Sequence, residues 1–352
     1  MSRLFSTPRP IVAAPMAGGP TTVALALAVA RVGGFPILAG GYKTADALDA
    51  EIQQLRAEDV PFGVNLFVPS ATSIEPAALA AYARELSPEA AHYGLQLDPD
   101  PVTDDDHWGD KIELLTMHPV PLVSFTFGLP PGDTVPRLQK LGSKVLITVT
   151  TPDEAVAATQ HGADGLVLQG SAAGGHSATF DPVRTPQPVE LPALITSVRE
   201  VSGLPLIAAG GIDGAQAVQA VLDAGAIAAA VGTLLLRTDE AGTSDTHRAA
   251  LADPSFHETT ITHAFTGRPA RALSNDFITR HEAHAPYAYP AVHHLTRPIR
   301  QAAAKAGNAH DVHLWAGTGH RNAPTGPAAD VIRALYPIDN ESPQEDGARQ
   351  HE

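Results

Sequence analysis

The chain has 352 residues, 44% of them hydrophobic, so it can bury a large core and lacks the composition of a disordered protein. Its 38 acidic and 23 basic side chains give a net charge of −15, which argues against nucleic acids and anionic membrane surfaces as partners. The chain contains no cysteine, which excludes disulfides, thiolate metal sites and thiol nucleophiles.

The N-terminal segment leads directly into a strand-like run, IVAAP at 11–15, without the apolar core and cleavage site of a signal peptide. We therefore expect a cytoplasmic protein. The longest small-apolar stretch begins at Ala217 and contains Asp223 and several glycines, which is typical of a helix, a turn and a buried strand. No membrane-spanning segment is expected.

Eight short apolar runs alternate along the chain with segments of helical period. Continuous apolar runs favour parallel strands buried on both faces, and the intervening segments supply the crossover helices. Eight such units predict an α/β fold, a closed (β/α)8 or TIM barrel, of the class that reaches about 250 residues before insertions. The predicted strands are residues 11–15, 35–40, 62–68, 122–127, 145–150, 165–170, 205–211 and 227–233.

The alternation of strands and helices ends after the eighth run. We assign residues 1–236 and 324–338 to the barrel, the second range containing its closing helix, and residues 237–323 to a helical insertion that forms a lid over the barrel mouth. The polar residues 339–352 are expected to form a disordered tail. Three consecutive aspartates at 104–106 are interpreted as a solvated acidic loop, and no metal site is predicted.

The ends of the last two predicted strands carry glycines, and in this class of barrel the active site lies at the C-terminal ends of the strands. The seventh strand ends in Gly210 and Gly211, and the eighth ends in Gly232 and Thr233. Glycines there let backbone N–H groups approach a phosphate closely. A phosphate monoester is therefore expected at this end, although tight turns without a ligand would also need glycine.

Side chains at the ends of other strands suit a flavin ring. Asn65 and Gln169 are neutral amides that match the mixed donor and acceptor edge of an isoalloxazine, and Met16 offers an apolar contact to a ring face. The segment QGSAAGGH at 169–176 combines small residues, which let a ring lie against the backbone, with one imidazole at the rim. His176 is therefore the candidate catalytic base.

Seven segments together resemble the nitronate monooxygenase family, formerly called 2-nitropropane dioxygenases. They are APMAGGP at 14–20, GVNLF at 63–67, TVTTPDEA at 148–155, GADGLVLQGSAAGGH at 162–176, AAGGI at 208–212, VGT at 231–233 and FTGRPAR at 265–271. The resemblance extends from residue 8 to 336. It implies noncovalent FMN on a TIM barrel and oxidation of alkyl nitronates, with nitroalkanes as further candidates, by dioxygen that reoxidises the flavin.

The resemblance also implies roles for individual residues, with His176 as the catalytic base. The residues that would hold FMN are Ala14, Pro15, Met16, Asn65, Gln169, Gly174, Gly175, Gly210, Gly211, Ala230, Val231, Gly232 and Thr233. The family loop usually has glutamate and arginine where this chain has Ala172 and Ser177, which bears on how His176 is oriented and charged.

Residues of the insertion are expected to set substrate preference, Tyr287 and Tyr289 in particular. If His176 is not the base, the alternatives are four histidines of the same insertion: His281, His284, His293 and His294.

Three other functions stay open. An NAD(P)H-dependent flavin reductase of the enoyl-ACP reductase or quinone reductase type would use the same barrel and the same glycine-histidine loop. A flavin-free barrel that binds a phosphate ligand would explain the glycine turns but not the segment at 169–176, and a noncatalytic FMN carrier would need no base. FMN is favoured over FAD because no GxGxxG motif opens a βαβ unit. The sequence does not decide the oligomeric state, and a homo-oligomer stays open.

Overall fold

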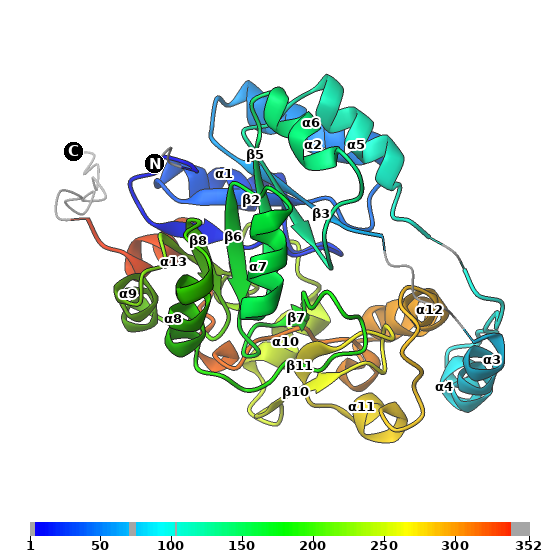
Figure 1. The fold of residues 1–352 in the computed structure, drawn as a ribbon. Helices are drawn as coiled ribbons and strands as arrows, with labels where there is room; N and C mark the ends of the chain where they lie inside the picture. Colours follow the sequence, from blue (N-terminus) through cyan, green and yellow to red (C-terminus); the bar gives the residue numbers. More distant parts are fainter. Residues whose placement is uncertain (1–3, 70–74, 103, 339–352) are drawn as a thin grey trace, which may run out of the picture.

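The computed structural model describes residues 4–69, 75–102 and 104–338, and the predicted tail at 339–352 lies outside these ranges. Eight parallel strands close into a barrel in the order β1-β2-β3-β4-β5-β6-β8-β9 (Figure 1). They are β1 Ile11–Ala13, β2 Phe35–Ala39, β3 Gly63–Phe67, β4 Leu122–Thr126, β5 Lys144–Val149, β6 Gly165–Gln169, β8 Leu206–Ala209 and β9 Ala228–Val231. The predicted (β/α)8 barrel is confirmed, and each strand end lies within one or two residues of its prediction.

Helices cover the outside of the barrel and return the chain from one strand to the next (Figure 1). They are α1 Val23–Arg31, α2 Ala45–Ala57, α5 Trp108–Met117, α6 Thr134–Lys140, α7 Pro152–Gln160, α8 Leu191–Val201, α9 Ala215–Asp223 and α13 Ala328–Leu335. Local chemistry explains where several begin. Thr151 caps α7 by accepting a hydrogen bond from Glu154 N, and Pro152 occupies the first turn, where no backbone N–H is needed.

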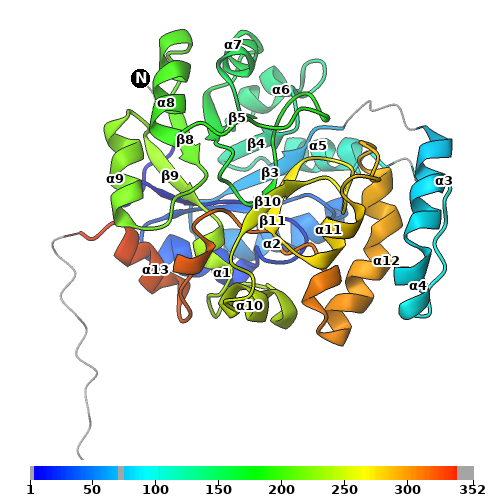
Figure 2. The ribbon, with the colours of Figure 1, turned by 90° about the horizontal axis from the view of Figure 1, so that it is seen from below.

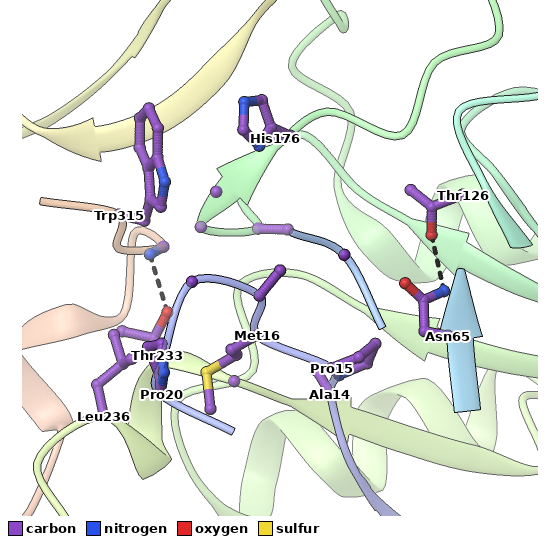
Figure 3. A pocket seen from close by; sticks show the side chains of 18 of the residues that line it. Ala14, Pro15, Met16, Pro20, Asn65, Thr126, His176, Thr233, Leu236 and Trp315 are labelled. Atoms are coloured by element: carbon purple, nitrogen blue, oxygen red, sulfur yellow. Dashed lines mark hydrogen bonds between the residues drawn. The ribbon is translucent and has the colours of Figure 1, made fainter. Parts of the chain in front are cut away.

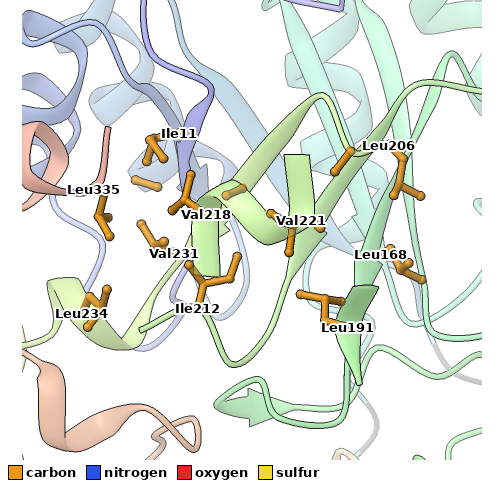
Figure 4. Close-up of a cluster of buried hydrophobic side chains, with 14 of the residues drawn as sticks. Ile11, Leu168, Leu191, Leu206, Ile212, Val218, Val221, Val231, Leu234 and Leu335 are labelled. Atoms are coloured by element: carbon orange, nitrogen blue, oxygen red, sulfur yellow. The ribbon is translucent and has the colours of Figure 1, made fainter. Parts of the chain in front are cut away.

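The strands alternate between two hydrophobic layers, as their period of two residues requires. On β1, Ile11 and Ala13 pack in the layer between strands and helices, whereas Val12 points into the barrel interior. Figure 4 shows part of the outer layer, where Val218 and Val221 of α9 lie close to the strands. Because both strand faces are buried, the runs are apolar throughout, which made them visible in the sequence.

The segment after β9 lies across one end of the barrel (Figure 2). It contains α10 Asp245–Ala252, β10 Thr259–Thr262, β11 Ala270–Leu273, α11 Asp276–His281 and α12 Ala291–Ala306, with 3-10 turns at Thr233–Leu235, Ala309–Asp311 and His320–Asn322. The prediction of a helical insertion was incomplete, because β10 and β11 pair antiparallel and β11 also pairs with β7, Gly175–His176. These strands of two to four residues are too short to show a sequence period.

Two helices between β3 and β4, α3 Pro76–Glu85 and α4 Ser87–His92, pack on the insertion (Figure 2). Leu79 and Tyr82 of α3 share a hydrophobic cluster with Phe265, Phe277 and Val292. The division into barrel and insertion stays a prediction, but this cluster joins residues from both predicted parts. None of the helices within the described ranges combines the length and the apolarity that a membrane span requires.

One buried hydrogen bond across this cluster can be tested by mutation. The Tyr82 hydroxyl donates to Ala264 O at 2.8 Å, and Tyr82 is only 1% exposed. Tyr82→Phe should lower the free energy of unfolding by about 1 kcal/mol, because the buried carbonyl loses its donor. The measurement is the urea unfolding midpoint, with Tyr287→Phe at a 39% exposed tyrosine as control. Equal midpoints for Tyr82→Phe and wild type would show that the bond does not stabilise the packing of α3.

Candidate functional site

A cavity of about 650 Å³ opens at the C-terminal ends of the barrel strands, beneath the insertion. Its volume lies within the range of about 300–1,000 Å³ that is usual for small-molecule sites. Every residue that the sequence proposed for the site, His176 and the thirteen flavin-contact candidates named above, lines this cavity. The fold therefore brings all of them together, while their individual roles stay predictions.

Glycines at the ends of β8 and β9 form a cradle of exposed backbone. Gly210 and Gly211 have φ of 112° and 72°, and a Cβ on Gly211 would lie 3.0 Å from the Cβ of Ala172. A Cβ on Gly232 would lie 3.5 Å from Met16 Sδ. Side chains would occupy this space, so backbone N–H groups can reach an anion there.

A segment near the C-terminus completes the cradle, and the sequence reasoning missed it. Gly317 N donates to Thr233 Oγ1 at 2.9 Å, the bond drawn dashed at the left of Figure 3. A Cβ on Gly174 would lie 2.5 Å from Gly317 N, so the two backbones are in close contact. The sequence GTG at 317–319 was the available signal, because glycines allow a close approach of two backbones.

The side-chain amides of Asn65 and Gln169 make different hydrogen bonds. Asn65 Nδ2 donates to Ser124 Oγ at 2.9 Å and Thr126 Oγ1 at 3.0 Å, and Figure 3 shows the Asn65 carbonyl oxygen on the cavity side. Gln169 instead holds its own loop, since Oε1 accepts from Ala178 N at 2.8 Å and Nε2 donates to His176 O at 3.1 Å. One N–H of Gln169 is left for a ligand.

His176 lies in β7, and Figure 3 shows its ring across the cavity from Met16, on the same side as Trp315. Its ring centroid is 5.8 Å from that of Phe127, 5.6 Å from Tyr289 and 5.3 Å from Trp315. His176 Nε2 lies 2.9 Å from Thr266 Oγ1. The imidazole is therefore held in one place by rings and by a hydroxyl, and no carboxylate of the described ranges is bonded to it.

Burial lowers the pKa of His176 to about 3, and the nearby guanidinium groups of Arg268 and Arg300 lower it further in the same direction. The imidazole is neutral at ordinary pH because a cationic ring would be poorly solvated and would be repelled by two buried positive charges.

The cavity is positively charged although the chain is acidic. Lys43, Arg297 and Arg300 line it, and no carboxylate is among the described residues that do. Lys43 is paired with Glu51 at 2.6 Å. Arg300 is only 4% exposed, and its hydrogen-bond partners, Thr296 Oγ1 at 3.0 Å and His293 O at 2.8 Å, are neutral. A buried cation without a counter-ion favours an anionic ligand.

The structure separates the alternative bases. His293 lines the cavity and stacks on Tyr42 with ring centroids 4.4 Å apart. The other three are bound to carboxylates outside it: His281 to Glu85 and Glu89, His284 to Glu85 and His294 to Asp104. His247 and His313 also line the cavity and were not singled out from the sequence, which offers no pattern around them.

The two tyrosines of the insertion also lie in different places. Tyr289 contacts His176 and donates to Tyr42 Oη at 3.2 Å, whereas Tyr287 is 39% exposed and stacks on His263. Only Tyr289 is therefore placed to influence a ligand in the cavity, and the expectation for Tyr287 has no structural support.

Comparisons with known proteins identify relatives along the whole chain. The family model for nitronate monooxygenase matches residues 2–337. A probable nitronate monooxygenase of Bacillus subtilis (strain 168) is 35% identical over 321 residues, 90% of this chain and 92% of the relative. A probable nitronate monooxygenase of Staphylococcus aureus (strain Newman) is 33% identical over 337 residues, 94% of each chain.

Among solved structures, nitroalkane oxidase from Streptomyces ansochromogenes has a TM-score of 0.90 and 47% identity, covering 94% of this chain and 95% of its own. FabK from Thermotoga maritima has a TM-score of 0.73 at 24% identity, covering 94% and 93%, and at this identity the likeness concerns the fold alone.

The histidines around the cavity predict an acid sensitivity. Burial lowers the pKa of His176 to about 3 and that of His247 to about 4, and it lowers the pKa of His293 and His313 well below 6.5. Below about pH 6.5 the unfolded chain gains protons at these side chains and the folded chain does not, so acid favours unfolding. The free energy of unfolding should fall as the pH drops from about 6.5 to 5, and these groups add no pH dependence above that window.

Urea unfolding midpoints at about pH 7.5 and pH 5 measure this effect. His247→Gln should reduce the difference between the two midpoints, because one low-pKa histidine is removed. The control is His284→Gln, at a side chain that is 58% exposed. If His247→Gln and wild type lose stability equally, the buried histidines are not the cause.

Proposed function

The chain belongs to the nitronate monooxygenase family, and we propose that it is an FMN-dependent enzyme that oxidises alkyl nitronates, and nitroalkanes more slowly, with dioxygen. It is an oxidoreductase, and the family and the nitroalkane oxidase neighbour support oxidation of nitro compounds. The observation that carries the proposal is one cavity that joins a glycine cradle, a neutral imidazole and the buried Arg300, which has no carboxylate partner among the described residues.

The residues around the cavity fit a flavin mononucleotide. Members of this family are generally flavin-dependent. The cradle of Gly211 and Gly232 has the backbone exposure that a phosphate requires, and Thr233 adds a hydroxyl. Asn65 and one N–H of Gln169 provide polar contacts for a ring edge, and the segment 14–16 provides an apolar floor. FMN bound here would accept two electrons from the substrate and pass them to dioxygen.

The charges of the cavity favour a nitronate over a neutral nitroalkane. A nitronate already carries a negative charge, which the buried guanidinium of Arg300 would stabilise. A neutral nitroalkane must first lose its α-proton to His176, and the resulting imidazolium would lie near Arg268 and Arg300. This step is disfavoured by the same effects that lower the histidine pKa, so slower turnover of nitroalkanes is expected.

The decisive experiment mixes the purified flavoprotein, without oxygen, with an alkyl nitronate such as propionate 3-nitronate, with the corresponding nitroalkane, or with NADH. We expect the nitronate to bleach the flavin absorbance fastest and oxygen to restore it. Bleaching by NADH alone would show instead that the protein is a reductase, and bleaching by none of the three would leave a carrier or another substrate. A protein that takes up no flavin would refute the proposal.

Binding of FMN through its phosphate can be tested separately. FMN should bind at least about tenfold tighter than riboflavin, because charge-assisted hydrogen bonds contribute about 1.5–3 kcal/mol each. Gly211→Ala should weaken FMN binding and leave riboflavin binding less affected, since its Cβ would crowd Ala172 at a φ of 72°. Gly109→Ala, where a Cβ would meet nothing within 4 Å, is the matched control. Equal affinities of wild type for FMN and riboflavin would show that the phosphate site is misplaced.

A further inference from the structure

The ring of His176 is held by a hydroxyl of the insertion. Thr266 lies in the turn between β10 and β11 and is only 1% exposed. Thr266 N and Gly267 N both donate to His263 O, at 3.2 and 2.7 Å, which fixes the turn. Thr266 Oγ1 lies 2.9 Å from His176 Nε2. The hydroxyl is thus presented to the imidazole by a rigid backbone.

The same hydroxyl has a second partner that can only accept. Thr266 Oγ1 donates to Arg268 O at 3.3 Å. That carbonyl is well placed, because the Arg268 side chain is anchored to Ser177 O and Thr179 O and lies over the Phe127 ring at 4.1 Å. Arg268 is fully buried, so its carbonyl has few other possible donors.

A hydroxyl carries a single proton, so Thr266 can donate to only one of its two partners, His176 Nε2 or Arg268 O. If Thr266 donates to Arg268 O, then Thr266 Oγ1 accepts, and His176 Nε2 must carry a hydrogen. The opposite arrangement, with Thr266 donating to His176, would leave the buried carbonyl without this donor and make one hydrogen bond fewer.

Resting on the proposed function, we propose that Thr266 is a positioning residue that fixes the tautomer of His176, so that Nε2 carries the hydrogen and Nδ1 offers its lone pair to the substrate. The low pKa of His176 agrees with this, because a neutral ring has one N–H only. Among the described residues no hydrogen bond occupies Nδ1, and His176 lines the cavity.

The backbone of His176 is fixed as well, so the ring has little freedom to exchange its two nitrogens. His176 pairs with Ala270 of β11, and His176 O accepts from Gln169 Nε2 at 3.1 Å. Phe127, Tyr289 and Trp315 pack around the ring. Both the position of the base and its protonated nitrogen therefore depend on the insertion.

With this tautomer, a neutral nitroalkane would transfer its α-proton to Nδ1 of His176. The Cα–H bond of a neutral nitroalkane breaks, its proton goes to Nδ1 of His176, and the electron pair stays on the substrate as the nitronate. Nε2 keeps its hydrogen and continues to donate to Thr266. A hydroxyl adds no negative charge, unlike the carboxylate that commonly orients a catalytic histidine, so Thr266 fixes the ring without raising its pKa. Thr266 would therefore explain how His176 keeps its orientation although Ala172 stands where the family loop usually has glutamate.

A direct test is the 15N NMR spectrum of histidine-labelled protein, which distinguishes a ring nitrogen that carries hydrogen from one that does not. The His176→Asn variant assigns the His176 signals among the 16 histidines by their loss. In wild type we expect hydrogen on Nε2 and a bare Nδ1. Hydrogen on Nδ1 would overturn the proposal, and this measurement needs neither a Thr266 variant nor enzymatic activity.

The functional test compares Thr266→Val, which keeps the shape but not the hydroxyl, with Thr266→Ser, which keeps the hydroxyl. The ratio of nitroalkane to nitronate turnover should fall about 10- to 100-fold in Thr266→Val, because only the nitroalkane needs a correctly protonated base. Thr266→Ser should keep the wild-type ratio, and flavin content should be equal in all three proteins. An unchanged ratio in Thr266→Val would refute the role of Thr266.

The two experiments separate failure of the inference from failure of the function. If wild type oxidises neither nitro compound, the proposed function is wrong, and the NMR spectrum still decides the tautomer of His176. If wild type oxidises both nitro compounds and Thr266→Val keeps the wild-type ratio of nitroalkane to nitronate turnover, the proposed function is supported and the positioning role of Thr266 is refuted.

Discussion

The hydrogen bonds that close the barrel between β1 and β9 determine where the site can form. Val12 pairs with Ala230 and Ala13 with Val231, and Ala14 N continues the ladder by donating to Val231 O at 2.9 Å. Because all eight strands are parallel, their carboxyl ends meet at one rim. Closure therefore places the segment 14–16 from the beginning of the chain against Gly232, and the remaining strand ends complete the ring around the cavity.

A second and much shorter pairing connects this rim to the insertion. β7 and β11 share the pairs His176 with Ala270 and Gly175 with Arg271, and Arg271 Nε donates to Ser171 O at 2.8 Å. The loop that carries the imidazole is thus bonded both to β11 of the insertion and to Gln169 at the end of β6. A glycine-rich loop without these bonds would be mobile, so precise placement of His176 depends on elements from both parts of the chain.

Charge is distributed in a way that the overall composition does not reveal. The chain has a net charge of −15, yet the described lining of the cavity carries arginines and neutral histidines and no carboxylate. Burial lowers the pKa of Arg268 and of Arg300 to about 10, which still leaves both groups charged at ordinary pH. Buried positive charge therefore favours an anionic ligand in the cavity, and the same charge adds to burial in keeping His176 neutral.

Much of the fold and the site could be predicted from the sequence, because barrel strands and their terminal turns are local features. Eight apolar runs that alternate with helical segments are enough to predict the strands, and the glycines at 210, 211 and 232 mark the cradle because they follow directly on the last two runs. The loop at 169–176 marked its histidine in the same way. Each of these signals is carried by consecutive residues.

Tertiary structure alone decided the rest. The strands β7, β10 and β11 are too short for a period, and α3 gave no sign that it packs on the insertion. Arg300, His313 and Trp315 reach the cavity from distant segments, without a motif around them. The sequence identified His176 as a residue of the rim but could not give the pKa of its side chain, because a pKa depends on burial and on charges brought from elsewhere in the chain. A local pattern identifies which residue stands at the rim, and only the folded chain determines the solvent and the charges that surround it.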